Sequence, residues 1–233
     1  MTIEPVAYIH SAFSQKFGIP RQSGLAPALL SKIVFEPKFR SPDAIRGLDG
    51  FDYLWLIWEF SANRKAGDSL AKAGSALTVR PPRLGGNKSM GVFATRSPFR
   101  PNPLGLSSVM LESIDYEDPQ GPVLWVRGAD LMDGTPIYDI KPYVSYADSH
   151  PDARCGYVDS LKERELALQI SPEVREALAS FPEAEALLEV LSLDPRPSYQ
   201  DDPERVYGLS FSGKNARFTV KDGLLTLLSL EDC

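Results

Sequence analysis

The sequence predicts a mainly β protein with two domains, a larger N-terminal domain of short strands followed by a small α+β domain. Short apolar segments separated by turns fill the first two-thirds of the chain. Helical spacing of apolar residues becomes prominent only after about Asp159, where the character of the sequence changes. We therefore expect domains at residues 1–158 and 159–233, which a chain of 233 residues is long enough to form.

Three strands are expected in the first domain. The run Phe51–Phe60 (FDYLWLIWEF) is apolar and aromatic, which is typical of a strand buried on both faces. Two further apolar segments, residues 107–117 and 121–131, flank the turn sequence Asp118-Pro119-Gln120-Gly121. Because proline, glycine and aspartate favour a tight turn, these two segments predict an antiparallel hairpin.

Three helices are expected from start signals and apolar spacing. Ser41-Pro42 begins a short helix that ends near Gly47, with serine as the cap and proline in the first turn. Ser171-Pro172 begins another, in which apolar residues recur at helical spacing as far as Phe181. Residues 184–191 repeat that spacing beyond Pro182, so a third helix follows directly.

The C-terminal end of the chain predicts a three-stranded meander. Residues 194–205 contain three prolines and read as an extended connector. Apolar residues then alternate in 207–211 and again in 218–220, after a turn at Gly213-Lys214-Asn215. A second turn at Lys221-Asp222-Gly223 leads into the apolar segment LLTLLSL, which completes the meander.

Composition excludes several classes of protein. No secretory signal or membrane-length apolar run is visible, and the formal net charge is −6, so we expect a cytoplasmic protein that does not coat nucleic acid indiscriminately. The two cysteines, Cys155 and Cys233, lie far apart and predict neither a disulfide nor a zinc site. The two histidines, His10 and His150, are too few for a histidine-rich metal site, so we expect no metal. No glycine-rich dinucleotide fingerprint, phosphate loop, HExxH or GxSxG motif occurs.

A basic, proline-rich segment stands out against this acidic background. No aspartate or glutamate occurs from Ser69 to Leu111, whereas six lysines and arginines do. The prolines fix backbone torsions, and arginine offers a planar fork that suits phosphate or carboxylate. A solvated loop with surface ion pairs is the plainer interpretation, but the lack of compensating acids favours anion binding. The residues that we expect to contact an anionic partner are Arg80, Arg83, Lys88 and Arg100.

A segment of opposite polarity, Leu131–Asp148, follows it. Near its start is the turn sequence Asp133-Gly134-Thr135-Pro136, and Asp139 and three tyrosines follow. Carboxylates and aromatic faces together favour a sulfonium or ammonium ligand. A purely structural turn explains the same pattern equally well, and spacing alone leaves both interpretations open.

The two segments together resemble the TrmO (YaeB/TsaA-like) family of S-adenosylmethionine-dependent tRNA (adenine-N6)-methyltransferases. The stretches that carry the resemblance are spread in the family's order over nearly the whole chain. They are KFGIPRQSGL, AIRGLDGFDYLWLIWEF, VRPPRLGGNKSMGVFATRSPFRPNPLGLS, LMDGTPIYDIKPY and DPRPSY. The resemblance implies an antiparallel β-barrel as the main domain, which agrees with the missing dinucleotide fingerprint. It also implies a homodimer whose cofactor pocket lies near the subunit boundary.

The activity that this resemblance implies is N6-methylation of threonylcarbamoyladenosine next to the anticodon of certain tRNAs, with S-adenosyl-L-methionine as methyl donor. Cofactor contacts are carried over by motif. They would be Pro20, Arg21, Gln22, Ser61, Ala62, Arg96, Leu106, Asp133, Gly134, Thr135 and Pro136.

Two departures from the family pattern concern the pocket. Ser61 stands where the family often has histidine, so a backbone contact would survive there but a contact through an imidazole would not. The stretch IHSAF stands where the family commonly shows Ser-Pro followed by an aromatic residue, and its effect on the pocket entrance is open.

The methyl transfer itself is an in-line displacement that needs alignment of nucleophile, methyl carbon and sulfur rather than a metal. Asp133 or Asp139 would serve as base towards the acylated nitrogen, or Tyr138 would orient the ureido group. The basic residues named above would meet tRNA phosphates or the threonyl carboxylate, which makes binding salt-sensitive. Two alternatives stay open at this point: a non-catalytic RNA-binding β-module, and a methyltransferase acting on another RNA or a small molecule.

Overall fold

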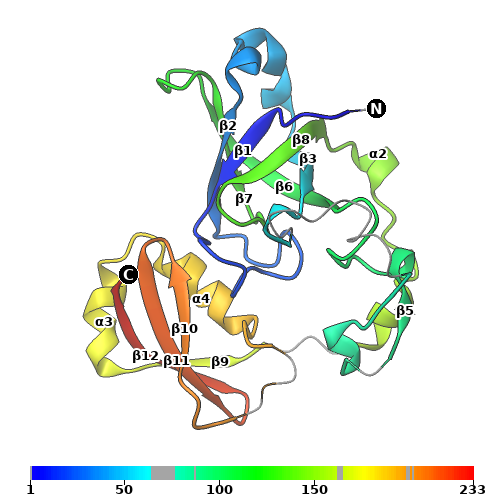
Figure 1. Cartoon of the computed structure of the whole chain (residues 1–233). Coiled ribbons are helices and arrows are strands. Elements are labelled where there is room, and N and C mark those ends of the chain that lie inside the picture. The colour runs from blue at the N-terminus through cyan, green and yellow to red at the C-terminus, as the bar shows by residue number, and fades with distance from the viewer. Residues whose placement is uncertain (1, 64–76, 87, 162–164, 198–199, 201) are drawn as a thin grey trace.

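The computed structural model describes residues 2–63, 77–86, 88–161, 165–197, 200 and 202–233. The described part consists mostly of strands. It forms a closed barrel and, beside it, a smaller mixed sheet that packs with two helices (Figure 1). This arrangement confirms the predicted fold class, an antiparallel β-barrel with a small α+β unit on its C-terminal side. The division at residues 158 and 159 remains our proposal.

Six antiparallel strands close the barrel in the order β1-β2-β7-β6-β3-β8. Full closure leaves no unpaired strand edge, which is how a small all-antiparallel sheet protects its backbone. The strands are β1 (Ala7–His10), β2 (Leu30–Phe35), β3 (Tyr53–Glu59), β6 (Leu104–Asp115), β7 (Val123–Arg127) and β8 (Thr135–Pro142).

The β6–β7 hairpin lies where the sequence predicted it. The backbone N–H of Gly121 donates to the carbonyl of Asp118 at 2.9 Å, which closes the expected turn. β3 corrects another prediction, because it is not buried on both faces. Its inward residues Leu54 and Leu56 are completely buried, whereas Tyr53 is 45% exposed. A barrel strand has only one face inside, and the alternating pattern was hidden because its outward residues are also aromatic or aliphatic.

The connections of the barrel contain short helical turns. The helix expected after Ser41 is a single 3-10 turn, in which the Ser41 hydroxyl accepts from the backbone N–H of Asp43 at 3.3 Å. The short helices are η1 (Pro37–Phe39), η2 (Pro42–Ile45), η3 (Leu48–Gly50), η4 (Ser61–Asn63), η5 (Pro82–Leu84), η6 (Val92–Ala94), α2 (Ser145–Asp148) and η7 (Gly156–Ser160).

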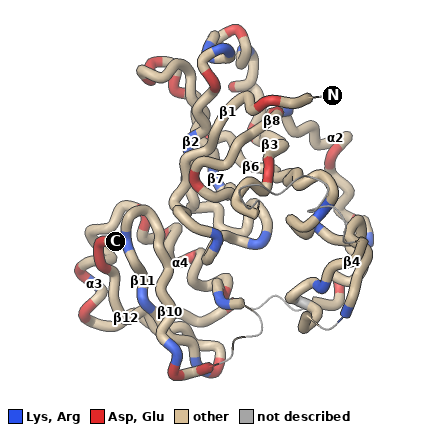
Figure 2. Tube along the Cα trace, in the orientation of Figure 1, with Lys and Arg blue, Asp and Glu red and all other residues tan. Residues whose placement is uncertain are grey.

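The basic segment forms an arm beside the barrel. Two-residue strands β4 (Thr78–Val79) and β5 (Met90–Gly91) pair antiparallel in this arm. Figure 2 shows lysine and arginine positions along the arm near β4, and others on the C-terminal strand β11. Residues 64–76, which include Lys72 of the basic segment, lie outside the described residues.

The C-terminal sheet has the order β10-β11-β12-β9. The meander and both helices match the sequence prediction, but β9 was missed because four residues give little periodicity and their partner is the last strand. β9 runs parallel to β12. The elements are β9 (Ala167–Ile170), α3 (Pro172–Ala179), α4 (Ala184–Ser192), β10 (Tyr207–Phe211), β11 (Lys214–Lys221) and β12 (Leu224–Asp232).

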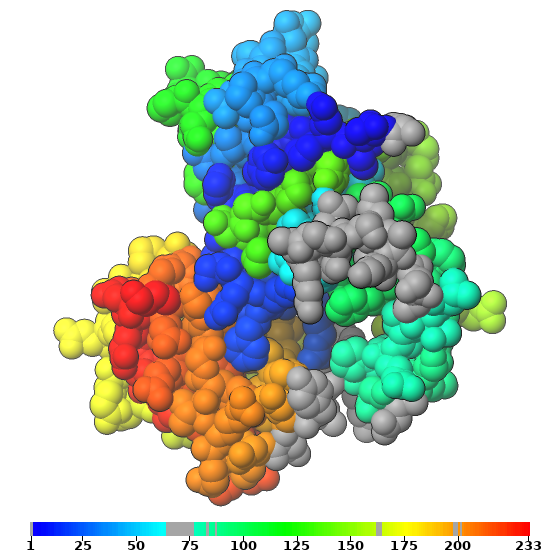
Figure 3. All heavy atoms as spheres, viewed as in Figure 1, coloured from blue at the N-terminus to red at the C-terminus, as the bar shows by residue number. Residues whose placement is uncertain are grey.

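The segment between β1 and β2 belongs to the core of the C-terminal sheet rather than to that of the barrel. Phe13, Ala26 and Leu29 are buried in one cluster with the helices and strands of the C-terminal unit. The Phe13 ring packs edge-on against Phe211 with centroids 5.5 Å apart. In the space-filling view this early segment (blue) lies directly against the C-terminal strands (orange; Figure 3). The backbone that leads to Pro20 is thus held by the far end of the chain.

Candidate functional site

A cavity of about 910 Å³ opens where the barrel, the segment after β1 and the connector before β6 meet. Its volume lies in the range of sites that hold small molecules and cofactors. Its walls come from residues 16–23, from β3 and η4, from residues 93–108 and from the β7–β8 connection. Parts of the chain that are distant in sequence therefore converge on one concave surface.

Two tryptophans of β3 form an aromatic wall of the cavity. The indole N–H of Trp55 donates to Asp148 at 3.0 Å, and the same carboxylate oxygen accepts from the backbone N–H of Val144 at 2.8 Å. These two hydrogen bonds, the backbone bond first, lower the pKa of Asp148. Asp148 consequently stays ionised at neutral pH and fixes the orientation of the Trp55 ring.

The second tryptophan begins a directed chain of hydrogen bonds that ends on a carboxylate. Trp58 Nε1 donates to the Ser107 hydroxyl at 2.9 Å, and that hydroxyl donates to Asp130 Oδ1 at 2.5 Å. Indole nitrogen only donates, so the Ser107 proton must point to Asp130. All three side chains are buried or partly buried, and Trp58 and Asp130 line the cavity.

Among the carboxyl groups in the described part of the chain, Asp130 is the one whose pKa is raised by its surroundings. Burial raises its pKa, and this effect outweighs the Ser107 hydrogen bond, the charge of Arg96 and the backbone N–H of Ser23, which act the other way. The loop that brings Ser23 here is anchored by the Gly24 N–H, which donates to the Gly128 carbonyl at 2.8 Å. Arg96 also donates a hydrogen bond to the side-chain carbonyl of Gln22.

A second carboxylate, Glu59, lines the cavity at the end of β3 and is only 5% exposed. The Tyr138 hydroxyl on the neighbouring strand β8 donates a hydrogen bond to Glu59 Oε2. A charged residue buried at a barrel strand end needs such a polar partner. The pair links the predicted catalytic tyrosine to the cavity wall, although Tyr138 is not itself among the lining residues.

Most of the predicted cofactor contacts lie on this one cavity. They come from four separate segments of the chain, and Arg100, predicted for tRNA, lies with them. The predicted residues among the lining residues are Pro20, Arg21, Gln22, Ser61, Ala62, Arg96, Arg100, Leu106 and Thr135.

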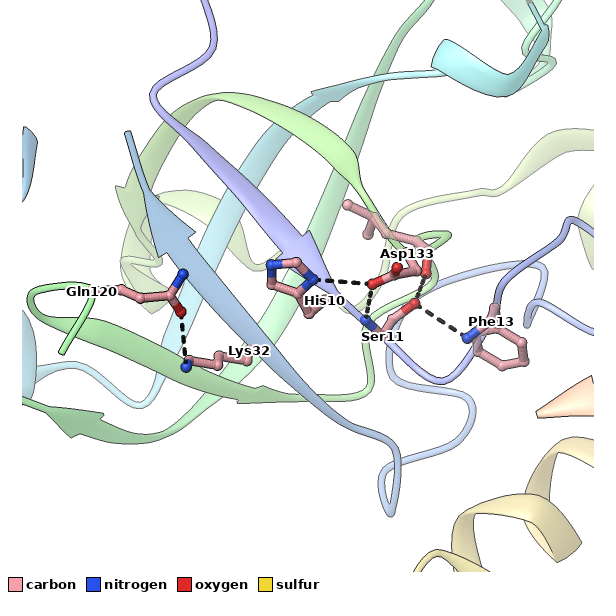
Figure 4. Close-up of polar contacts among 7 residues, drawn as sticks. His10, Ser11, Phe13, Lys32, Gln120 and Asp133 are labelled. Carbon is pink, nitrogen blue, oxygen red and sulfur yellow. Dashed lines mark hydrogen bonds and ion pairs between the residues drawn. The ribbon is translucent and has the colours of Figure 1, made fainter. Parts of the chain in front are cut away.

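Asp133 lies in the turn that precedes β8, next to the end of β1. Its carboxylate oxygen Oδ1 accepts from the backbone N–H of Ser11 at 3.1 Å and lies 3.3 Å from His10 Nδ1 (Figure 4). The backbone N–H groups of Asp133 and Gly134 donate to the carbonyls of Phe13 and Ile9, both at 2.8 Å. The carboxylate therefore fastens β1 to β8, and neither Asp133, Gly134 nor Pro136 is among the lining residues.

The remaining polar residues of the acidic segment spread along β8 instead of forming one group. Asp139 Oδ2 lies 2.9 Å from Lys141 Nζ, and its other oxygen accepts from the N–H of Ile140. Tyr143 packs against Tyr53 and Trp55 at the far end of the strand, and Tyr146 is 91% exposed beyond it. Ten residues of extended chain separate Asp133 from Tyr143, about 33 Å, so one ligand cannot contact both ends.

The predicted anion-binding residues lie along the arm and the connector that follows it. Arg80 and Lys88 are exposed, and Arg83 belongs to η5, with its side chain outside the described residues. Arg100 is partly buried and donates to the carbonyl of Thr95 at 3.2 Å. Of these residues, only Arg100 lines the cavity.

Sequence reasoning missed the cavity residues Trp58, Glu59 and Asp130, and it missed Ser107, which hydrogen-bonds to two of them. Trp58 and Glu59 were seen only as part of an apolar strand, although a charged residue ending such a run was a usable signal. Ser107 and Asp130 lie 23 residues apart and meet only through the β6–β7 hairpin. Within the described residues, no group of three or more histidine, cysteine, aspartate or glutamate side chains is arranged to hold a metal ion. No helix in that part is long and apolar enough to cross a membrane.

Family models match both parts of the chain. The tRNA-methyltransferase O N-terminal domain matches residues 8–149, and the TrmO C-terminal domain matches residues 163–233. The chain belongs to the TrmO family. This confirms the resemblance on which the carried-over residues depend.

Relatives within the TrmO family match the chain over nearly its whole length. The tRNA (adenine(37)-N6)-methyltransferase of Escherichia coli K12 is 38% identical, covering 98% of this chain and 97% of the relative. A putative S-adenosylmethionine-dependent methyltransferase of Pseudomonas aeruginosa is 41% identical over 89% of this chain and 87% of its own. The crystal structure of TrmO from Pseudomonas aeruginosa superposes with a TM-score of 0.80 at 32% identity, covering all of this chain and 97% of the other.

Proposed function

We propose that this protein transfers the methyl group of S-adenosylmethionine to N6 of adenine 37 in tRNA, and that the adenine carries a threonylcarbamoyl group. The observation that carries the proposal is the convergence of Pro20–Gln22, Ser61–Ala62, Arg96 and Leu106 on one cavity. The motifs that name these residues lie far apart in the sequence. Relatives that cover nearly the whole chain are named for the same reaction.

The cavity fits the proposed cofactor in size and in chemistry. The aromatic walls suit a purine ring, because stacking on tryptophan accepts a flat, polarised heterocycle. A cation and a carboxylate, Arg96 and Asp130, suit the charged groups of an amino acid. When bound, S-adenosylmethionine would supply a methyl carbon on a sulfonium, which the N6 lone pair attacks in line while the C–S bond breaks and the neutral thioether S-adenosylhomocysteine leaves.

The residues of the chain then serve mainly to align the acceptor and to manage one proton. Ionisation of the acylated N6–H raises the nucleophilicity of the nitrogen, so an acceptor for that proton assists the reaction. Our proposed catalytic residues remain Asp133 or Asp139 as base, or Tyr138 to orient the ureido group, although none of the three is among the residues that line the cavity. Tyr138 has the most direct link to the cavity, because its hydroxyl proton is held by Glu59.

The tRNA is proposed to lie across the arm and the cavity mouth. Arg80, Arg83 and Lys88 would meet phosphates, while Arg100 is near enough to the cavity to meet the threonyl carboxylate. Single-stranded anticodon bases can be turned out of the stack and presented to such a cavity. The surrounding compartment is proposed to be the cytoplasm, where tRNA is modified.

A homodimer is part of the proposal. Phe93 and Leu106 line the cavity mouth, yet they are 75% and 57% exposed, and the nearby Phe99 is 61% exposed. Large apolar side chains at the rim of a site are typical of a surface that a second protein covers. A second copy seated there would shield the cofactor from solvent.

The decisive experiment supplies purified protein with S-adenosylmethionine and two tRNA preparations, with and without the threonylcarbamoyl group at position 37. We expect nucleoside mass spectrometry to find one added methyl group on the base of threonylcarbamoyladenosine only, in a reaction that slows as salt is raised. Arg96→Ala should abolish it, and the charge-changing control Asp43→Asn, an exposed residue on η2, should not.

Each contrary result has a distinct meaning. Methylation of the tRNA without threonylcarbamoyl would reject the proposed substrate but keep the methyltransferase. Binding of tRNA by a protein that does not bind the methyl donor would reject the enzyme and favour an RNA-binding module.

A further inference from the structure

We propose that Asp130 binds the α-ammonium group of the cofactor while Arg96 binds its α-carboxylate, so that the two residues together recognise the amino acid end of S-adenosylmethionine. This inference rests on the proposed function, because it names the contacts of the same cavity. Asp130 was not among the residues that the family motifs suggested, and its role is inferred from its hydrogen bonds, its burial and its place on the cavity.

The first step is the pairing of opposite charges from distant parts of the chain. Arg96 follows η6, and Asp130 lies between β7 and β8, yet both side chains line the same cavity. An amino acid carries its ammonium and carboxylate on the same carbon atom. Adjacent positive and negative side chains in one cavity are complementary to such a zwitterion.

The second step is that Asp130 is held as an acceptor. Its Oδ1 receives the Ser107 hydroxyl proton, whose direction is fixed by the indole N–H of Trp58. The loop anchored at Gly24 places the backbone N–H of Ser23 against the same carboxyl group. A carboxylate oriented in this way presents a fixed negative charge before any ligand arrives, which lowers the cost of binding.

The third step compares the other charged groups on the cavity. Among the described lining residues, Glu59 is the second carboxylate, and it already accepts from Tyr138. The side chain of Lys16 donates to Asn63 at the cavity edge. The cations Arg21 and Arg100 also line the cavity, and neither supplies an acceptor for an ammonium group. Asp130 is thus the carboxylate beside Arg96 that suits this role.

The partial burial of Asp130 favours binding of a cationic ligand. A partly buried carboxylate whose ionisation is opposed by its surroundings gains most from a cationic ligand, because the ligand replaces the missing solvation. The charge-assisted hydrogen bond that results has a typical strength corresponding to roughly 10-fold to 100-fold in affinity.

The test measures binding by calorimetry, without catalysis, using three ligands. They are S-adenosylhomocysteine, its analogue with the α-ammonium replaced by hydrogen, and 5′-methylthioadenosine, which has no amino acid end. For the unaltered protein we expect the deaminated analogue to bind roughly 10-fold to 100-fold more weakly than S-adenosylhomocysteine. Asp130→Asn should weaken S-adenosylhomocysteine by about 10-fold or more and leave the other two ligands unchanged.

Two further variants complete the design. Asp43→Asn changes the same charge at an exposed site on η2 and should leave all three affinities unchanged. Ser107→Ala removes the hydroxyl that orients Asp130 and should cause a smaller loss for S-adenosylhomocysteine alone. This variant and the comparison of ligands on the unaltered protein test the idea even if Asp130→Asn folds poorly.

The idea is overturned if Asp130→Asn binds S-adenosylhomocysteine as well as the unaltered protein does, or if it loses all three ligands equally. An equal loss would mean that Asp130 only maintains the shape of the cavity. If the unaltered protein binds none of the ligands and no S-adenosylmethionine, the proposed function itself fails, which is a separate result.

Discussion

At the scale of single residues, Asp130, which we propose to bind the cofactor, lowers the stability of the free protein. Asp130 is buried enough for its pKa to rise, because desolvation outweighs the Ser107 hydrogen bond and the charge of Arg96. A group whose folded-state pKa lies above its unfolded value favours folding when it is protonated. Asp130 therefore destabilises the free protein increasingly as pH rises from its unfolded-state pKa, near 3.8, through its higher folded-state pKa.

Removing that charge should stabilise the free protein at neutral pH. We expect Asp130→Asn to melt higher than the unaltered protein at pH 7, by on the order of a few degrees. The difference should disappear as pH falls below about 4, where both states of the unaltered protein are protonated. Thermal unfolding across that pH range, without cofactor, measures this. A lower melting temperature for Asp130→Asn at pH 7 would show that the Ser107 and Arg96 contacts outweigh desolvation.

At the residue scale, motifs in the sequence led to residues that share the cavity, whereas side-chain contacts were not predictable. Pro20, Gln22 and Arg96 were carried over by motif and lie on the cavity. Asp133 was carried over by motif in the same way, yet its carboxylate accepts a hydrogen bond from Ser11 and so joins β1 to β8. Side-chain direction depends on long-range pairing, and a single sequence does not show it.

At the scale of elements, the pairing of β3 with β6 fixes the aromatic wall. Trp58 lies opposite Gly105 in this pairing, and the indole ring covers the glycine. A Cβ on Gly105 would come within 2.3 Å of the ring atom Cε2. Real side chains do not approach so closely, so glycine is required here for close approach and not for an unusual backbone angle.

Gly105→Ala should therefore displace the Trp58 ring and weaken its hydrogen bond to Ser107. We expect a loss of about 1–3 kcal/mol in the free energy of unfolding, as is usual for overpacking, together with weaker binding of S-adenosylhomocysteine. Denaturant unfolding followed by tryptophan fluorescence, and calorimetry, measure the two effects. Gly50→Ala is the matched control, because nothing lies within 4 Å of its added carbon. Equal behaviour of the two variants would contradict the packing argument.

Elements were predictable where local signals suffice. The β6–β7 hairpin, α3, α4 and the C-terminal meander follow from turn residues and apolar spacing within a few residues. The barrel strands β1, β2 and β8, the parallel strand β9 and the small β4–β5 sheet were not found, because their partners lie elsewhere in the chain. Tertiary pairing therefore decided what local patterns left open.

At the scale of the whole molecule, the C-terminal sheet supports the cavity without lining it. The segment that carries Pro20–Gln22 contains no regular helix or strand, and its neighbours Phe13, Ala26 and Leu29 are buried in the C-terminal core. Gly18 has a positive φ of 89°, and a side chain there would meet Leu209 of β10 within 2.2 Å. The position of the predicted cofactor loop thus depends on β10.

Leu209→Ala should loosen that loop from a distance. We expect the variant to lose about 2–5 kcal/mol of stability and to bind S-adenosylhomocysteine more weakly at a temperature at which it is still folded. Leu225→Ala deletes the same atoms from a fully buried position on β12, where its partners are Val220 and Leu168. This control should lose stability with unchanged ligand affinity. If both variants lose the same affinity for S-adenosylhomocysteine, the position of the loop does not depend specifically on β10.

Barrel closure was the part of the global fold that residue patterns did not reveal. Two of its contacts, β1 with β8 and β3 with β8, join segments that are far apart in sequence. The apolar alternation of each strand is compatible with an open sheet or a sandwich as well. The barrel was expected only from the family resemblance.

The place of β12 between β11 and β9 has a consequence for folding. β12 follows the other strands of the C-terminal sheet in sequence, and both of its neighbours need it to pair. Until β12 has paired, Phe13 and its apolar neighbours have no complete core to enter, although they lie far from it in sequence. In a partly folded molecule the segment between β1 and β2 therefore exposes apolar side chains that favour aggregation.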